Sequence, residues 1–421
     1  MTTTHAPARP RPAADGARTA HAVVTGIGVT APNGLGTAPW WEATTNGVSG
    51  IRPISRFDPA RYPSRLAGEV PDFVAKEHLP GRLLPQTDHM TRLALVAADE
   101  AFADAGIDPK ELPEYAAGVV TAASAGGFEF GQRELEALWS KGGQYVSAYQ
   151  SFAWFYAVNT GQIAIRNGLR GPSGVLVSEQ AGGLDAIAQA RRQLRRGVRL
   201  LVTGGIDSAL CPWGWTAHLA GGLLSTSDRP DRAYLPFSAE ASGHVAGEGG
   251  ALLILEDAAA ARERGARVYG SVAGYASTFD PPVGKGAPRL ADAARLALAD
   301  AGLTAADVDV VFADAAGDRA ADRAEAEAIT ALFGPRGVPV TAPKTMTGRL
   351  SSGGASLDVA AALLALRDQV VPPTVHVERT ADDCPLDLVT GAARETALST
   401  ALVLARGRGG FNSAVVVRAQ P

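Results

Sequence analysis

Cysteine is nearly absent from this sequence. Cys211 and Cys384 are the only two thiols among 421 residues, and they form no Cys-x-x-Cys spacing. Two isolated cysteines argue against both a disulfide framework and a zinc site. Because so few thiols are typical of proteins in a reducing compartment, we predict a cytoplasmic protein with no bound metal.

Long apolar runs and an excess of basic charge are missing as well. No run of about 18 apolar residues occurs, so the sequence predicts no membrane-spanning helix and no membrane partner. The formal net charge is −4, which argues against nucleic acid as a partner, because binding it normally requires a basic face. Residues 1–20 hold no apolar core of a signal peptide. We predict a disordered N-terminal tail there.

Glycine and apolar residues are abundant by contrast. The 48 glycines and 46% hydrophobic residues are typical of a large globular body with many tight turns. Strand-like runs alternate with alanine-rich helical patterns along the chain. This alternation favours an α/β architecture in which helices cover the sheets.

Two stretches far apart in the chain resemble each other. Residues 90–107 and 290–303 each have the pattern of an alanine-rich amphipathic helix that ends in Ala-Asp-Ala-Gly. The glycine of each is expected to end the helix, and an apolar strand follows soon after. Two copies indicate an internal duplication rather than a solenoid. We therefore expect an N-terminal half at residues 21–265 and a C-terminal half at residues 266–421.

Gln180 lies at the sharpest local feature of the sequence. Residues 175–177 favour a strand and residues 181–196 favour a helix, so Gln180 is expected at a tight bend between them. A side chain at that bend lies at the positive end of the helix, where a nucleophile would be activated and presented to a substrate. Gln180 carries an amide there instead of a nucleophile.

The segment around Gln180 resembles the nucleophile turn of β-ketoacyl synthases, in which a cysteine stands at the position of Gln180. The resemblance extends over nearly the whole chain and implies a thiolase-like fold, a layered αβαβα structure built from two duplicated halves. Four further segments carry it in the family's order: VVTGIGVTAPNGLG within residues 23–51, PFSAEASGHVAGEGG within residues 236–257, PKTMTGRLSSGGAS at residues 343–356 and GRGGFNSAVVV at residues 407–417.

The chain departs from that family at the residues that carry its chemistry. The resemblance implies that condensation needs a cysteine thiolate and two histidines. Gln180 replaces the cysteine, Asp314 replaces the first histidine, and Arg349 replaces the second, five residues after Lys344. Arg408 stands where the family has a phenylalanine. We therefore expect no residue that catalyses condensation, and we expect Asp314 and Arg349 to form an ion pair that fills the vacated pocket.

These departures are similar to those of one branch of the family, the β subunits or chain-length factors of type II aromatic polyketide synthases. That resemblance implies a heterodimer with an active ketosynthase α subunit within an acyltransferase complex. It also implies contact with a polyketide intermediate and an acyl carrier protein, whose phosphopantetheine arm carries the substrate, with no bound cofactor. The alternative is a glutamine-type malonyl decarboxylase or initiation ketosynthase, with Gln180 as the decarboxylating residue; that type keeps both histidines.

Two features are open to more than one interpretation. The resemblance places Phe128, Gly131 and Leu135 on one helical face that lines the end of a tunnel and limits chain length, but plain packing would also explain them. Residues 145–156 hold six of the 26 aromatic residues and indicate a core or interface helix. Residues 191–196 hold four arginines, which suit either a solvated helix end or docking of an acidic carrier protein.

Overall fold

The computed structural model describes residues 21–282 and 284–420. The predicted tail at residues 1–20 lies outside the described residues. Within the described part of the chain, no helix is long and apolar enough to cross a membrane. The same residues contain no group of three or more acidic, histidine or cysteine side chains that could hold a metal ion.

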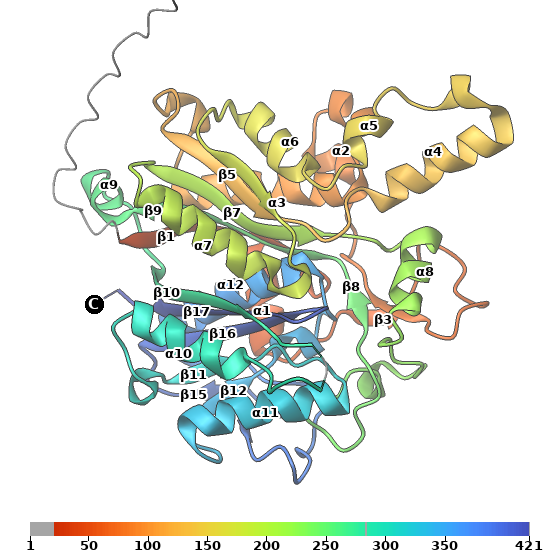
Figure 1. Ribbon diagram of the computed structural model, residues 1–421. Helices are drawn as coiled ribbons and strands as arrows, with labels where there is room; N and C mark the ends of the chain where they lie inside the picture. Colours follow the sequence, from red (N-terminus) through yellow and green to blue (C-terminus); the bar gives the residue numbers. More distant parts are fainter. Residues whose placement is uncertain (1–20, 283, 421) are drawn as a thin grey trace, which may run out of the picture.

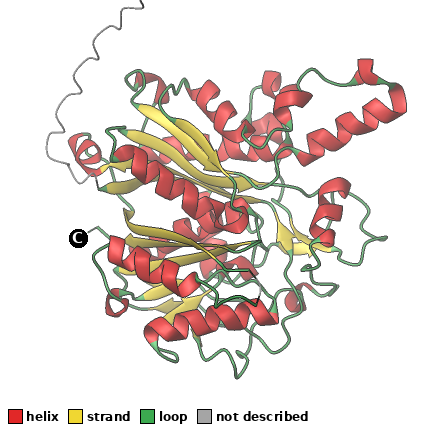
Figure 2. Cartoon of the chain, viewed as in Figure 1, coloured by secondary structure: helices red, strands yellow, loops and turns green. Residues whose placement is uncertain are grey.

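Most strands belong to one hydrogen-bonded sheet that folds into two stacked parts, called here the first and the second sheet, which meet between β1 and β10 (Figures 1 and 2). Two small sheets, β3-β4-β8 and β13-β15, are separate from it. One sheet has the order β1-β9-β7-β5-β6 and the other the order β14-β12-β11-β16-β17-β10. Only two residue pairs connect β1 to β10, which is where one sheet passes into the other. The bounds of these strands are β1 (Ala22–Ala31), β5 (Ala117–Ala122), β6 (Ser173–Leu176), β7 (Leu200–Asp207), β9 (Gly249–Asp257), β10 (Gly270–Phe279), β11 (Val310–Phe312), β12 (Pro339–Thr341), β14 (Asp387–Leu388), β16 (Thr400–Gly407) and β17 (Phe411–Arg418).

Helices lie between the sheets and on both outer faces (Figure 1). Helices α7 and α12 occupy the middle layer, α3 and α6 cover the first sheet, and α10 and α11 cover the second. The layers therefore alternate as helix, sheet, helix, sheet and helix. The helix bounds are α1 (Thr37–Thr45), α2 (Ala75–His78), α3 (His89–Ala105), α4 (Phe128–Lys141), α5 (Gln150–Ala153), α6 (Val158–Asn167), α7 (Gly182–Leu194), α8 (Pro212–Ala220), α9 (Ala258–Glu263), α10 (Leu290–Asp300), α11 (Arg319–Phe333) and α12 (Ser352–Asp368).

The two similar stretches of sequence form helices α3 and α10, one against each sheet. Gly106 and Gly302, which follow these helices, both have left-handed backbones, with φ of 65° and 68°. Glycine adopts this conformation without the strain that a Cβ atom would add, so both predicted helix ends are confirmed. The division of the chain into halves near residue 265 stays a proposal.

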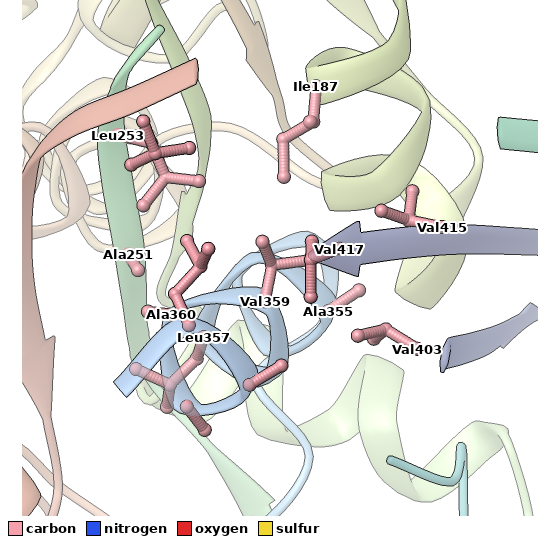
Figure 3. Packing of buried hydrophobic residues seen from close by; sticks show 14 of the residues in the cluster. Ile187, Ala251, Leu253, Ala355, Leu357, Val359, Ala360, Val403, Val415 and Val417 are labelled. Carbon is pink, nitrogen blue, oxygen red and sulfur yellow. The ribbon is translucent and has the colours of Figure 1, made fainter. Parts of the chain in front are cut away.

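Helix α12 is the centre of the hydrophobic core. Every residue from Ser352 to Leu366 is buried, as expected of a helix that is apolar on all sides. Its side chains meet Ile187 of α7, Leu253 of β9 and Val417 of β17 (Figure 3). At Gly183 a Cβ atom would lie 2.7 Å from the backbone nitrogen of Ser356, so glycine is required for the close approach of α7 and α12.

Candidate functional site

A cavity of about 590 Å³ opens where strands from both sheets end. Ser124, Gln180 and Asp207 follow or end the parallel strands β5, β6 and β7. Asp314 follows β11 in the second sheet, and the chain at the end of β16 also lines the cavity. The carboxyl edge of parallel strands is where α/β proteins commonly bind ligands.

Gln180 lies at the predicted bend. A short 3₁₀ turn, η4 (Glu179–Ala181), joins β6 to α7, and α7 begins at Gly182 and ends at Leu194, slightly inside the predicted range. Glu179 has a φ of 54°, a conformation that costs a residue with a side chain on the order of 1–3 kcal/mol. The bend is therefore kept, although no nucleophile stands on it.

The side chain of Gln180 faces the cavity floor. The residue is 7% exposed and lines the cavity. Its Oε1 atom lies against the first turn of α12, 3.4 Å from where a Cβ atom on Gly354 would be. Among the described residues, no backbone or side-chain group forms a hydrogen bond with its amide, and the residue lines the cavity.

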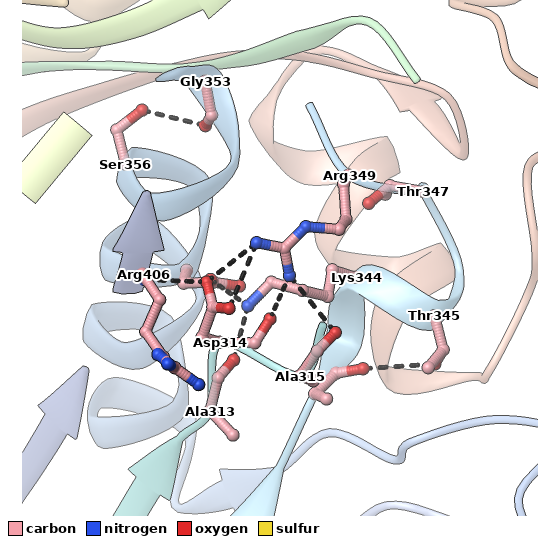
Figure 4. A network of polar contacts seen from close by, with 12 residues as sticks. Ala313, Asp314, Ala315, Lys344, Thr345, Thr347, Arg349, Gly353, Ser356 and Arg406 are labelled. Carbon is pink, nitrogen blue, oxygen red and sulfur yellow. Dashed lines mark hydrogen bonds and ion pairs between the residues drawn. The ribbon is translucent and has the colours of Figure 1, made fainter. Parts of the chain in front are cut away.

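Asp314 and Arg349 form the predicted ion pair (Figure 4). Arg349 Nη2 donates to both carboxylate oxygens of Asp314, at 3.0 and 3.1 Å, and Nη1 donates to the carbonyl oxygen of Asp314 at 2.7 Å. Burial opposes ionisation of Asp314, but the charges of Arg349 and Lys344 outweigh it and hold the pKa of that carboxyl below its usual range. The expectation that this pair fills the pocket is wrong, because the cavity remains open beside it.

Lys344 lies behind the cavity wall rather than in it. Its Nζ atom is 2.6 Å from Asp358 on α12 and also donates to the carbonyl oxygen of Ala313. Because Ala313 precedes Asp314, Lys344 ties the loop after β11 to the central helix (Figure 4). Its role in this structure is to hold the loop that carries Asp314.

Two acidic residues of α11 anchor the same loop from the other side. Glu325 accepts hydrogen bonds from the backbone nitrogens of Asp314 and Ala315, at 2.6 and 2.8 Å. Asp322 accepts from the nitrogen of Gly317 at 3.0 Å. Burial raises the pKa of both carboxyls, each to about 7. The backbone around Asp314 is therefore fixed by several buried polar contacts.

Arg408 lies at the exposed mouth of the cavity. Its backbone nitrogen donates to Glu179 Oε2 at 2.9 Å, and its Nη2 donates to the carbonyl oxygen of Gly221 at 3.1 Å. Arg408 thus links the bend beside Gln180 to the end of α8. It contacts solvent at the cavity mouth, as its position in the C-terminal loop suggests.

Three cavity residues were not found from the sequence. His218 on α8 and His244 both line the cavity. Burial lowers the pKa of His218 to about 4, and burial followed by the charge of Arg349 lowers that of His244 to about 3. Both imidazoles are therefore uncharged near neutral pH. Asp207 could have been found, because it ends an apolar strand at the sheet edge that also carries Gln180.

The three predicted tunnel residues have different surroundings. Phe128 begins α4 and lines the cavity, with its ring 4.6 Å from that of Trp213. Gly131 is buried, and a Cβ atom there would lie 2.6 Å from Trp154 Cδ1. Leu135 is 37% exposed and lies outside the cavity. Phe128 and Gly131 therefore both contact the stacked pair Trp154 and Trp213, whereas Leu135 lies on the surface.

Residues 145–156 are not the single helix that the sequence suggested. They comprise the end of η3 (Gly143–Tyr145), the short helix α5 and connecting loops, and all six of their aromatic residues are exposed. With the apolar side chains of α4, which projects from the body of the molecule (Figure 1), they form what we call the aromatic surface: Leu135, Leu138, Trp139, Tyr145, Tyr149, Phe152, Trp154, Phe155 and Tyr156. Large apolar side chains that are exposed in such numbers are typical of a surface that a partner covers.

The arginine run at the end of α7 is partly structural. Arg191 is buried, forms an ion pair with Asp300 of α10 and donates to the carbonyl oxygen of Ala273. Arg195 approaches the same carboxylate at 3.9 Å. The first arginine of the run therefore joins the middle layer to the second sheet, and carrier docking by the others stays a prediction.

Comparisons with known proteins give a consistent result. The family models for the N-terminal and C-terminal domains of β-ketoacyl synthases match residues 20–261 and 269–378. The tetracenomycin polyketide synthase ketoacyl synthase beta subunit of Streptomyces glaucescens is 61% identical over 399 residues, which cover 94% of this chain and 98% of that protein.

Two solved structures are also similar. The ishigamide ketosynthase/chain length factor has a TM-score of 0.88 at 27% identity and covers 95% of this chain and 99% of that chain. A type II PKS acyl-carrier protein in complex with its ketosynthase bound to the hexaketide contains a chain with a TM-score of 0.85 at 28% identity, with 95% and 99% covered.

Proposed function

The chain belongs to the β-ketoacyl synthase family, and on that premise we propose that it is a member that does not itself condense acyl units. It has the thiolase-like fold of that family. Its function is that of a β subunit, of the chain-length-factor type, in a type II polyketide synthase.

The single observation that carries the proposal is the chemistry at the cavity floor. Condensation in this fold needs a thiolate that forms a thioester, and the carboxamide of Gln180 cannot form one. The guanidinium of Arg349 has no lone pair with which to accept a proton, and it donates hydrogen bonds to Asp314 and Ala315. The site therefore forms no covalent bond to an acyl group.

Neither cysteine supplies the missing thiolate. Cys211 and Cys384 are both buried and absent from the cavity wall. Burial raises the pKa of the Cys211 thiol to about 11 and that of the Cys384 thiol to about 12. A thiol is a nucleophile only as its thiolate, which is scarce at such pKa values.

The aromatic surface supports pairing with a ketosynthase α subunit. Trp139, which lies near the C-terminal end of α4, is 85% exposed. Strand β6 lies at the edge of its sheet and is followed by Val177, which is 53% exposed. Exposed sheet edges and large aromatic side chains are both features that proteins usually cover with a partner.

In the proposed complex, an acyl carrier protein delivers the polyketide intermediate on its phosphopantetheine arm. The complex is proposed to work in the cytoplasm. A cavity with an exposed mouth and a fixed floor suits an acyl chain delivered on a flexible arm. We assign Phe128 and Gly131 a role in limiting chain length. Phe128 lines the cavity and its ring contacts that of Trp213, which stacks on Trp154 of the aromatic surface. Gly131 lies against both tryptophan rings. Leu135 lies outside the cavity, so a role for it in limiting chain length requires the partner to cover the aromatic surface.

Co-expression with a ketosynthase α subunit tests this function. We expect a stable 1:1 complex that makes polyketide with a carrier protein and malonyl units, whereas the isolated chain makes none. An isolated chain that releases a condensed product would contradict the proposal. The malonyl-decarboxylating alternative requires a malonyl carboxylate to bind beside Gln180.

A further inference from the structure

A second cavity, of about 830 Å³, lies beside helix α6. It shares no lining residue with the cavity at the strand ends. Most of its lining comes from α6, from the segment at α5 and from the 3₁₀ turn η1 (Gly81–Gln86). We call this cavity the α6 groove. Its volume lies within the range of sites that bind small organic molecules.

The walls of the α6 groove are largely apolar. Gly161 and Ile165 lie four residues apart on one face of α6, and Ile165 is 78% exposed. Leu83 contributes from η1, and Phe152 and Phe155 contribute from the segment at α5. Both phenylalanines are exposed as well. Apolar side chains that line a groove and remain exposed are typical of a surface that a ligand or a partner covers.

Gly161 widens the groove at its helical wall. Apart from the nearby backbone of its own helix, a Cβ atom added at Gly161 would meet no heavy atom within 4 Å. Its φ is not positive either, so neither packing nor backbone conformation requires glycine at this position. Glycine inside a helix lowers stability relative to alanine. A glycine that the fold does not require, in the wall of a groove, suits the close approach of a ligand to the backbone.

The rim of the groove carries positive charge. Arg82 and Lys110 both line the groove and are exposed, and neither forms an ion pair with another described residue. The other two charged residues of the lining neutralise each other, because Arg166 donates to both carboxylate oxygens of Asp99, at 3.1 and 2.6 Å. The groove therefore has an excess of positive charge that the chain itself does not compensate.

An apolar wall beneath a cationic rim matches a ligand with an apolar body and a negatively charged end. Phe152 and Phe155 favour a ring system as that body, since aromatic rings pack against one another in offset or edge-on arrangements. We propose that the α6 groove binds an aromatic carboxylate. The ring system lies against the two phenylalanines and Gly161, and the carboxylate faces Arg82 and Lys110.

A segment of the α subunit is the alternative occupant, because Phe152 and Phe155 also belong to the aromatic surface. An apolar segment would take Arg82 and Lys110 out of water without pairing either charge, which is unfavourable. The charges of the rim therefore favour a small anion over an apolar segment of a partner. This inference goes beyond the proposed function and does not depend on it.

Two probes of nearly the same shape test the inference on the purified full chain. 2-Naphthoate and 2-naphthamide share one ring system, but only the first carries a negative charge. Calorimetry or ligand-observed NMR gives the two dissociation constants. We expect 2-naphthoate to bind about fivefold more tightly, the effect of one partly exposed charge pair, and we expect salt at about 0.5 M to reduce this preference. Equal binding, tighter 2-naphthamide binding, or no detectable 2-naphthoate binding would overturn the proposal.

A variant that fills the groove locates the site. Gly161→Trp places a ring where the space is open, so it should weaken 2-naphthoate binding at least about tenfold. The unfolding temperature should not fall, because glycine is the poorer helix former of the two residues. Ala299→Trp is the matched control, since Ala299 is an exposed residue of α10, which covers the second sheet. Unchanged binding in Gly161→Trp, or equal weakening in both variants, would overturn the assignment.

A second pair of variants tests the role of the rim. Replacing both Arg82 and Lys110 by glutamine should weaken 2-naphthoate binding about fivefold and leave 2-naphthamide binding unchanged. Replacing Arg319 and Arg323 of α11 by glutamine changes the net charge equally and should affect neither ligand. Equal loss of 2-naphthoate binding in the two double variants would mean that net charge, not the rim, attracts the anion, and would overturn the proposal.

The complex with the α subunit decides between the two occupants. We expect the assembled complex to bind 2-naphthoate as the free chain does. Loss of that binding on assembly would show that the partner fills the groove and would overturn the inference. Failure to form the complex would contradict the proposed function instead and would leave the two dissociation constants of the free chain unaffected.

Discussion

Arg349 and Asp314 form a closed pair in which the guanidinium contacts both carboxylate oxygens and the backbone of the same residue. The two side chains are 7% and 3% exposed. In the ketosynthases that this chain resembles, the corresponding positions hold the two histidines. An acid–base pair of side chains has thus been replaced by two charges that neutralise each other.

Removing one partner of this pair should strongly destabilise the fold. Arg349→Met leaves Asp314 buried without its counter-charge, which we expect to lower the free energy of unfolding by about 3–5 kcal/mol. Urea unfolding of the variant and of the unmodified chain measures this difference in the free energy of unfolding. Arg323→Met is the control, because Arg323 and Glu327 form an exposed pair at 3.7 Å on α11 and such pairs contribute about 0–1 kcal/mol. A loss below about 1 kcal/mol in Arg349→Met would contradict the prediction.

Glu325 should make stability depend on pH. Burial raises its pKa to about 7 in the folded chain, above the value of about 4.3 in an unfolded chain. Its contribution to stability is therefore fully present below pH 4 and is lost as the pH rises toward 7 and beyond. In Glu325→Gln the free energy of unfolding should fall less steeply between pH 5 and pH 7 than in the unmodified chain.

Glu327→Gln provides the control for this pH dependence. Glu327 lies on the same helix, but its side chain is 70% exposed, so its replacement should leave the slope unchanged. Urea unfolding at pH 5, 6 and 7 gives the three slopes. Equal slopes in the unmodified chain and in Glu325→Gln would show that Glu325 titrates normally.

Gly131→Phe should shorten the polyketide made by the reconstituted complex. The added ring must displace Trp154, whose Cδ1 atom would lie 2.6 Å from the new Cβ atom, or Trp213 beside it. Either movement changes the packing against Phe128, whose ring contacts Trp213 and lines the cavity. Mass spectrometry of the products measures chain length. Gly81→Phe is the control, because an added Cβ atom meets nothing within 4 Å there; an unchanged product in Gly131→Phe would refute the assignment.

Trp139→Glu should weaken assembly without affecting the fold. The side chain is 85% exposed on α4, so its replacement should change the free energy of unfolding by less than about 0.5 kcal/mol. If the aromatic surface binds the α subunit, the dissociation constant should rise at least about tenfold, as is typical of an interfacial tryptophan. Analytical ultracentrifugation of mixtures with the α subunit measures the amounts of complex and of free subunit, and so the dissociation constant.

A second exposed apolar residue controls for the added charge in that experiment. Leu296 is 53% exposed on α10, a helix that covers the second sheet, whereas α4 projects beside the first sheet (Figure 1). Leu296→Glu should leave assembly unchanged. Equal weakening in both variants would mean that the effect comes from net charge rather than from the aromatic surface.

Local features of the fold could be predicted because they depend on neighbouring residues. Gly106 and Gly302 end their helices by adopting a backbone that other residues avoid, and Gln180 lies between a strand and a helix as the pattern indicated. The pairing of Asp314 with Arg349 followed from two opposite charges at positions that the family brings together. These inferences needed no knowledge of packing.

What could not be predicted depends on distant packing. The open cavity beside Arg349 is set by side chains from both sheets, and no sequence pattern reports its volume. His218 and His244 reach it from segments with no recognisable motif. Residues 145–156 were expected as a helix, but aromatic residues favour a core and an interface equally, and here short turns expose most of them.

Intact-protein mass spectrometry of the reconstituted complex, after exposure to acyl-loaded carrier protein, tests most directly whether this chain forms a covalent acyl intermediate. The α subunit should gain the mass of the acyl group, and this chain should keep its unmodified mass. An acyl adduct on this chain, at Gln180 or at either cysteine, would contradict the conclusion that it shapes the site beside the bond-forming subunit without forming bonds itself.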